Sequence, residues 1–160
     1  MKKEIKTLSH IREARYTFGA YSDNFMGCDL VMTSSVNTDG TIGEHVTLCT
    51  GDNDFSTHTS TLDVFAQIIR SFAKESVSLS HNATFSHFRK IEYGIPVDDE
   101  SVPNGEIVFR FNVFFPQPGV ISDRVEVDAG KGYIEVSLGS MNEFSDAVEH
   151  FIQDLTSAKE

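Results

Sequence analysis

The densest group of charged side chains in this sequence lies in the stretch from residue 94 to residue 105. Asp98, Asp99 and Glu100 are consecutive there, and no basic residue occurs between positions 91 and 109. A row of carboxylates complements a basic groove on another protein and guides its approach. Two Gly and two Pro residues in the same stretch predict an exposed loop. We therefore expect these three acidic residues to form a partner-binding site; the alternative is a solvated loop without a partner.

A second candidate site involves two polar side chains inside the most apolar stretch of the chain. Arg110 and Asn112 alternate with Phe109, Phe111 and Val113, which places them on the opposite face of a strand. Arg89, on a strand expected nearby, is a third member of this group. An Arg on an open sheet face can bind a carboxylate or a phosphate. The alternative is that this face is polar only because it is solvated.

Carboxylates near position 55 suggest a third kind of site, a calcium loop. Asp52, Asp54 and Asp63 supply oxygen ligands at separated positions, as such loops do. However, Thr57 stands where a calcium loop requires Gly, and the last residue is Asp rather than Glu. We therefore expect no metal site, and these three residues remain the least supported alternative.

Catalytic and cofactor-binding motifs are absent from the sequence. The six His residues include no pair two or four positions apart, the spacings that place two ligands on one face of a strand or helix. The chain also contains no phosphate-binding glycine loop, nucleophile elbow, HExxH motif or dinucleotide fingerprint. These absences predict a protein that is not an enzyme and that uses no cofactor.

The net charge of −11 is unevenly distributed. Residues 1–15 carry +3, and residues 16–160, with 8 basic and 22 acidic side chains, carry −14. Such a surface disfavours direct binding to nucleic acid or anionic lipid and attracts a basic protein. No apolar run reaches the length of a membrane span. The N-terminal residues lack the apolar core of a signal peptide, which predicts a cytoplasmic location.

Hydrophobic periodicity predicts several strands. The strongest is 106–115, where apolar residues occupy every second position. An Asp-Gly pair at positions 39 and 40 predicts a hairpin between strands 28–36 and 41–50. Further strands are expected at 11–21, 83–93, 120–127 and 133–138.

Two amphipathic helices are expected at about 60–75 and 141–156, each after a capping box, Ser60 with Asp63 and Ser140 with Glu143. We predict a single α+β domain over 1–160, in two layers, with both helices on one face of a mostly antiparallel sheet of about six or seven strands. Residues 1–9 should be loosely ordered and 51–59 should be a polar loop. Strand runs followed by a helix recur in 10–78 and 79–160, which suggests a two-fold internal repeat.

Size, charge and missing motifs favour a small acidic binding protein that neutralises a basic protein partner. A toxin-neutralising immunity protein and a phage-type inhibitor of a nuclease or defence system are examples of this class. One alternative is a small-ligand binder or enzyme that uses the open sheet face around Arg110. Another alternative is a self-assembling structural protein joined through an exposed edge strand.

Overall fold

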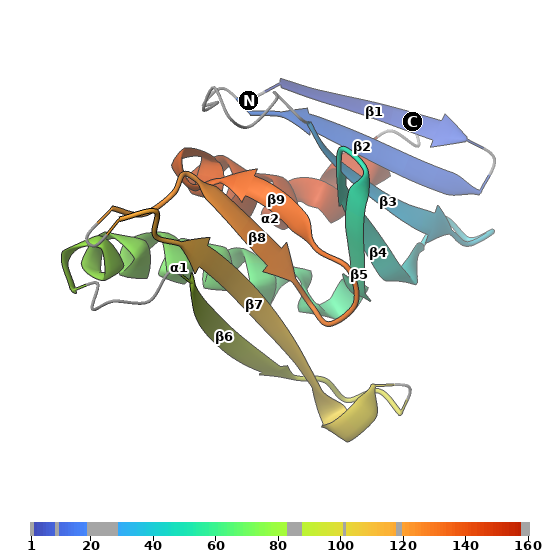
Figure 1. Ribbon diagram of the computed structural model, residues 1–160. Coiled ribbons are helices and arrows are strands. Elements are labelled where there is room, and N and C mark those ends of the chain that lie inside the picture. The colour runs from blue at the N-terminus through green and yellow to red at the C-terminus, as the bar shows by residue number, and fades with distance from the viewer. Residues whose placement is uncertain are drawn as a thin grey trace.

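The computed structural model describes residues 2–8, 10–18, 29–82, 88–100, 102–117 and 120–157. These residues form nine strands and two α-helices, which confirms the α+β class (Figure 1). The strands are β1 (Lys2–Leu8), β2 (Ile11–Thr17), β3 (Leu30–Val36), β4 (Ile42–Thr50), β5 (Asn53–His58), β6 (Phe88–Pro96), β7 (Glu106–Phe114), β8 (Arg124–Asp128) and β9 (Ile134–Ser137). The helices are α1 (Leu62–Asn82) and α2 (Met141–Ser157), and short 3-10 helices occupy Thr59–Thr61, Pro103–Gly105 and Leu138–Ser140.

The strands form two antiparallel sheets, and the prediction of one sheet with six or seven strands is wrong. The first sheet has the order β1-β2-β3-β4-β5, and the second has the order β6-β7-β8-β9. Strand β9 lies beside β4 and β5, and the Glu135 N–H donates to the Thr50 hydroxyl at 3.0 Å. Gly132 adopts a φ of 73° in the loop before β9, where a Cβ would collide with the Asp54 carbonyl oxygen. The sheets therefore adjoin without sharing a hydrogen-bonded strand ladder.

The two halves of the chain share one succession of elements. In each half, an antiparallel meander leads through a single 3-10 turn into an α-helix. Both helices lie on the same side of the sheets (Figure 1). This succession agrees with the pattern behind the predicted repeat, while an origin by duplication stays a prediction.

Stacked phenylalanine rings attach the helices to the sheets. Phe65 of α1 stacks on Phe109 of β7 with ring centroids 4.1 Å apart. The Phe65 ring also makes edge contacts with Phe55 of β5 and Phe144 of α2. Two turns further along α1, the ring of Phe72 stacks on that of Phe111, with ring centroids 4.4 Å apart. The apolar face of 106–115 is thus covered by α1, as its periodicity predicts, and buried residues of both sheets and both helices form one core cluster.

Residues 2–8, within the stretch predicted to be loosely ordered, form strand β1. All of β1 pairs with β2, and Lys3 reaches the helix layer, where its ammonium group contacts the Asp154 carboxylate at 2.6 Å. The Tyr16 hydroxyl donates to the same carboxylate at 2.9 Å. Asp154 is itself buried, although the α2 pattern predicts that it faces solvent. A buried carboxylate needs such partners, and these contacts hold β1 in place.

The predicted polar loop at 51–59 is also wrong, because residues 53–58 form β5. A two-residue turn at Gly51 and Asp52 returns the chain alongside β4, and Phe55 enters the core. The start of the following helix differs as well. A 3-10 helix over Thr59–Thr61 precedes α1, and the His58 side chain caps this 3-10 helix by accepting a hydrogen bond from the Ser60 N–H.

The core position of Phe111 leads to a first prediction. Phe111→Ala should lower the free energy of unfolding by about 3–5 kcal/mol, because it leaves a cavity between Phe72 and Tyr93. Phe114→Ala, on the exposed face of the same strand, is the matched control and should cost about 1 kcal/mol or less. Urea denaturation measures both values, and equal losses would contradict the assignment of the two faces.

The buried Tyr16 hydroxyl leads to a second prediction, about pH. Burial, followed by the hydrogen bond to Asp154, raises the Tyr16 pKa well above its ordinary value of 10.0. The unfolded chain ionises this hydroxyl near pH 10, whereas the folded chain keeps its proton. Its contribution to stability is therefore complete below pH 10 and is lost as the pH rises further, by about 1.4 kcal/mol per pH unit.

Urea unfolding at about pH 8 and about pH 11 tests this dependence. Tyr16→Phe should lose less stability between the two pH values than the wild type does. Tyr133→Phe removes an exposed tyrosine and should keep the wild-type dependence. Equal pH dependence in the wild type and Tyr16→Phe would refute the prediction.

Candidate functional site

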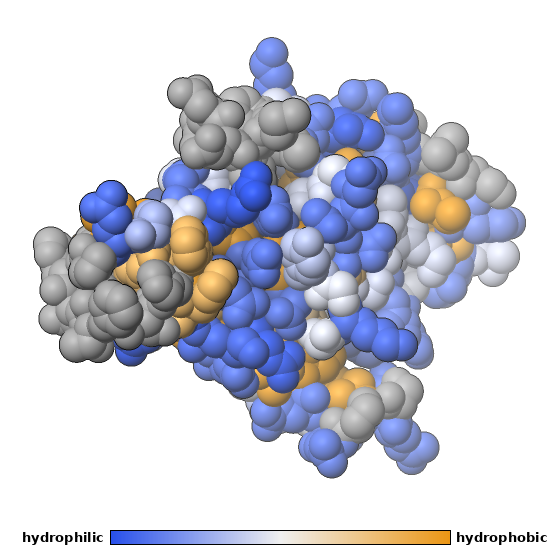
Figure 2. All heavy atoms as spheres, in the orientation of Figure 1, coloured by the Kyte–Doolittle hydropathy of each residue, from blue (hydrophilic) through white to orange (hydrophobic). Residues whose placement is uncertain are grey.

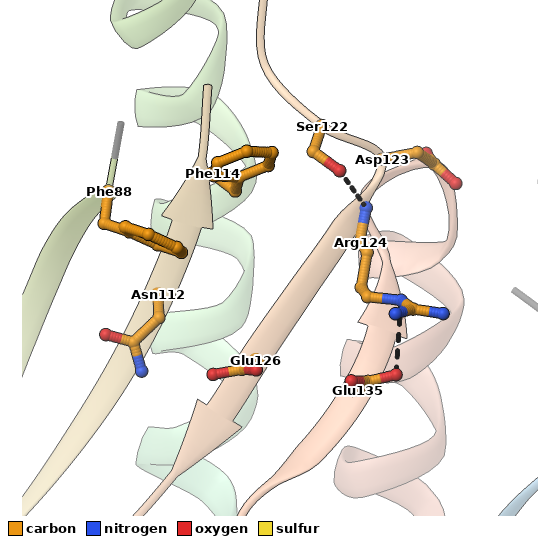
Figure 3. Close-up of a pocket in the computed structure, with 8 residues that line it drawn as sticks. All are labelled: Phe88, Asn112, Phe114, Ser122, Asp123, Arg124, Glu126 and Glu135. Carbon is orange, nitrogen blue, oxygen red and sulfur yellow. Dashed lines mark hydrogen bonds and ion pairs between the residues drawn. The ribbon is translucent and has the colours of Figure 1, made fainter. Parts of the chain in front are cut away.

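The outer face of the second sheet, turned away from the helices, contains a hollow of about 510 Å³. It is lined by Phe88, Asn112, Phe114, Ser122, Asp123, Arg124, Glu126 and Glu135. These residues come from all four strands of the sheet and from the segment before β8. Figure 3 shows Phe88, Phe114 and Asn112 on one side, Arg124 and Glu135 on the other, and Glu126 between the two groups.

The apolar side of the hollow is an exposed aromatic pair. Phe88 and Phe114 are directly opposite each other on β6 and β7, and their ring centroids lie 5.0 Å apart. Phe88 is 68% exposed and Phe114 is 37% exposed. Figure 2 shows an apolar patch over these ends of β6 and β7, beside a hydrophilic surface. Large exposed apolar side chains next to a hollow are typical of binding surfaces.

The polar side of the hollow is acidic. Glu126 and Glu135 are directly opposite each other on β8 and β9, an arrangement in which two like charges repel. Arg124 neutralises one of them, with its Nε atom 3.2 Å from a Glu135 carboxylate oxygen. Glu126 makes no ion pair with any residue in the part of the chain that the structure describes.

Asp123 has a structural role at the rim of the hollow. Its carboxylate accepts hydrogen bonds from the Ser137 hydroxyl at 2.6 Å and from the Gly139 N–H at 3.3 Å. These bonds hold the turn between β9 and α2. Of the acidic residues in the hollow, Glu126 is thus the best placed to receive an external cation.

The predicted ligand-binding group is only partly assembled. Arg110 and Asn112 do share the outer face, but Arg89 is opposite Val113 in the register and so lies on the other face. Arg110 lies between two carboxylates, 3.9 Å from Glu92 and 3.4 Å from Asp128. Of the three residues, only Asn112 lines the hollow with the aromatic pair.

The predicted acidic site lies at the opposite end of the second sheet, in the connection between β6 and β7 (Figure 1). Asp98 and Glu100 are exposed there. Asp99 is directed inward, and its carboxylate lies 2.7 Å from Nε2 of His58. Asp99 thus contacts another part of the protein, whereas Asp98 and Glu100 face solvent. Partner binding by this loop stays a prediction.

The carboxylates of the calcium alternative are distributed over three elements. Asp52 lies in the turn before β5, Asp54 lies within β5, and Asp63 lies in the first turn of α1. The strand between the turn and the helix spans about 20 Å. Among the described residues, these three do not belong to any cluster with ligand atoms close enough to share an ion.

No protein-family model matches the chain, and no curated protein sequence matches it significantly. In the described part of the chain, neither helix is long and apolar enough to cross a membrane.

Sequence reasoning missed most residues of the hollow. The strand at 106–115 has Phe114 on its polar face, which is a signal that this face is not merely solvated. The pairing of Glu126 with Glu135 was not visible, because it depends on the register of β8 and β9. The hairpin loop 129–133 allows several registers, so the two carboxylates could not be placed opposite each other beforehand.

A third prediction concerns Arg110. Arg110→Ala should change the free energy of unfolding by about 1 kcal/mol or less, because ion pairs on a partly exposed sheet face contribute little. Urea denaturation beside Phe111→Ala provides the measurement. If Arg110→Ala lowered the free energy of unfolding as much as Phe111→Ala does, Arg110 would be needed for the stability of the fold.

Proposed function

We propose that this protein is a small, acidic, non-enzymatic binding protein that neutralises a basic protein partner. Inhibition of a nuclease or of a defence protein, in the manner of an immunity protein, is the biological role that fits this class. The observation that carries the proposal is the hollow with an exposed aromatic pair beside the unneutralised carboxylate of Glu126.

An arginine or lysine side chain of the partner is the occupant that this hollow favours. A guanidinium or ammonium group is attracted to the face of an aromatic ring, which Phe88 and Phe114 provide. A carboxylate beside the ring forms a charge-assisted hydrogen bond with the same cation. Glu126 supplies that carboxylate, and the amide oxygen of Asn112, on the phenylalanine side of the hollow, can accept a further hydrogen bond (Figure 3).

The repulsion between Glu126 and Glu135 supports the same conclusion. Like charges opposite each other on neighbouring strands lower stability by up to about 1 kcal/mol. Arg124 offsets part of this cost at Glu135, and a cation bound at Glu126 would remove the rest. Binding sites often retain arrangements that are unfavourable for the free fold. The net charge of −11 would in addition accelerate the encounter with a basic partner.

The alternative functions receive less support. The guanidinium of Arg110 is already placed between two carboxylates, so it is poorly available to an anionic ligand. The two sheets have the edge strands β1, β5, β6 and β9, and β5 lies beside β9, so assembly through an edge strand would use β1 or β6. Charged side chains on β1, including Lys2, Glu4 and Lys6, discourage edge-to-edge pairing there.

A fourth prediction tests the proposal with the native host extract. The purified wild-type protein should capture a basic protein, identified by mass spectrometry, and their complex should weaken strongly between about 0.01 M and about 1 M salt. The double variant Glu126→Gln, Glu135→Gln should bind this partner at least about tenfold more weakly, because it loses charged hydrogen bonds. Titration calorimetry measures the affinity.

The matched control is Asp98→Asn, Glu100→Gln, which removes the same charge from the exposed loop. Wild-type affinity in this control places the contact in the hollow, whereas weakened binding only in this control places it in the loop. Capture of a partner that no salt concentration affects would overturn the proposal. The hollow variant should unfold at about the wild-type urea concentration, because relief of the repulsion between Glu126 and Glu135 offsets the lost ion pair of Arg124 with Glu135. Unchanged unfolding would exclude misfolding as the cause of lost binding.

A further inference from the structure

A second group of polar side chains lies where the first sheet meets the connection between β6 and β7. Glu44 lies on β4, His58 ends β5, and Asp99 lies in the connection. One ligand atom from each of these residues lies within 4.8 Å of the other two. Nε2 of His58 is 2.7 Å from a carboxylate oxygen of Asp99. Three separate segments of the chain thus direct metal-ligand atoms toward one point.

We propose that Glu44, His58 and Asp99 bind a divalent first-row transition-metal ion, with Zn²⁺ as the reference ion. An imidazole with two carboxylates is a ligand set that suits these ions better than calcium or magnesium, which favour oxygen alone. Zinc lies about 2.0–2.2 Å from such ligands. Its ligand atoms are then about 3–3.5 Å apart, so small side-chain rotations would close the present cluster around an ion.

The surroundings of His58 would orient it for this role. Its side chain is only 14% exposed, and its Nδ1 atom lies 2.7 Å from the Ser60 hydroxyl. When a metal occupies Nε2, the ring carries its proton on Nδ1 and donates it to this hydroxyl, and this bond replaces the one that Nδ1 accepts from the Ser60 N–H in the ion-free protein. Such a hydrogen bond on the second ring nitrogen fixes the tautomer and the ring orientation in metal sites.

The other two ligands are positioned by backbone contacts. The Thr59 hydroxyl donates to the Gly43 carbonyl at 2.6 Å, which ties the segment before Glu44 to the turn that follows His58. The Asp99 carbonyl accepts a hydrogen bond from the Val102 N–H at 3.0 Å. Glu44 is exposed and can move onto an ion, whereas His58 and Asp99 are already in contact.

A hollow of about 410 Å³ opens beside the cluster. His58 lines it together with His45, whose ring lies at an edge-to-face angle 5.6 Å from that of His58. This space would admit water or a ligand group to the remaining coordination positions of a bound ion. The site lies at the end of the second sheet away from Phe88 and Phe114, and it does not depend on the proposed function.

A fifth prediction tests the site in the full-length protein after removal of metals with a chelator. Titration calorimetry with Zn²⁺ should detect binding that Glu44→Gln weakens at least about tenfold, and that Asp99→Asn also weakens. Co²⁺ should give visible absorption bands with the wild type that are lost in both variants. Zn²⁺ should raise the unfolding temperature of the wild type, because it binds only the folded state.

The matched control is Glu100→Gln, which removes a neighbouring exposed carboxylate outside the cluster. It should bind Zn²⁺ as the wild type does. Because the Glu44 side chain is exposed, Glu44→Gln should fold normally, and circular dichroism checks this. Wild-type affinity in Glu44→Gln, or no binding of either ion at about 1 mM, would refute the site.

Discussion

The structure depends on the stacking of Phe65 against Phe109. The Phe65 ring is the point at which α1, α2 and both sheets meet, since it also contacts Phe55 and Phe144. Buried residues of both sheets and both helices form one core cluster around this ring. Aromatic rings are well suited to this position, because a single side chain can bury a large apolar area and contact several neighbours at defined angles.

This arrangement leaves the outer face of the second sheet uncovered. The same strand β7 that places Phe109 and Phe111 in the core places Asn112 and Phe114 outside. The rigid inner packing thereby holds an outer surface with exposed aromatic rings and opposed carboxylates. A surface of this kind is unfavourable for the isolated protein, and a cationic partner would make it favourable. The proposed function therefore rests on the contrast between the two faces of one strand.

The Glu44, His58 and Asp99 cluster has a different origin. It exists because β5 pairs with β4 and because the connection after β6 reaches the end of β5. The register of the tight turn at Gly51 and Asp52 places His45 opposite His58. Reading 53–58 as a strand would have predicted this pairing, since a two-residue turn determines the register on both sides. The contact with Asp99, in contrast, joins segments 41 residues apart.

Local pattern in the sequence determined the α+β class, the hairpin around Asp39 and Gly40, the two amphipathic helices and the buried face of β7. Each of these follows from the spacing of neighbouring residues, which the chain carries wherever it folds. Tertiary structure alone decided the division into two sheets, the burial of Asp154 beside Lys3 and Tyr16, and the side of β6 on which Arg89 lies. These features depend on strand register and on contacts between distant segments. A shift of one residue in register moves every side chain of a strand to the other face, and no local signal prevents it.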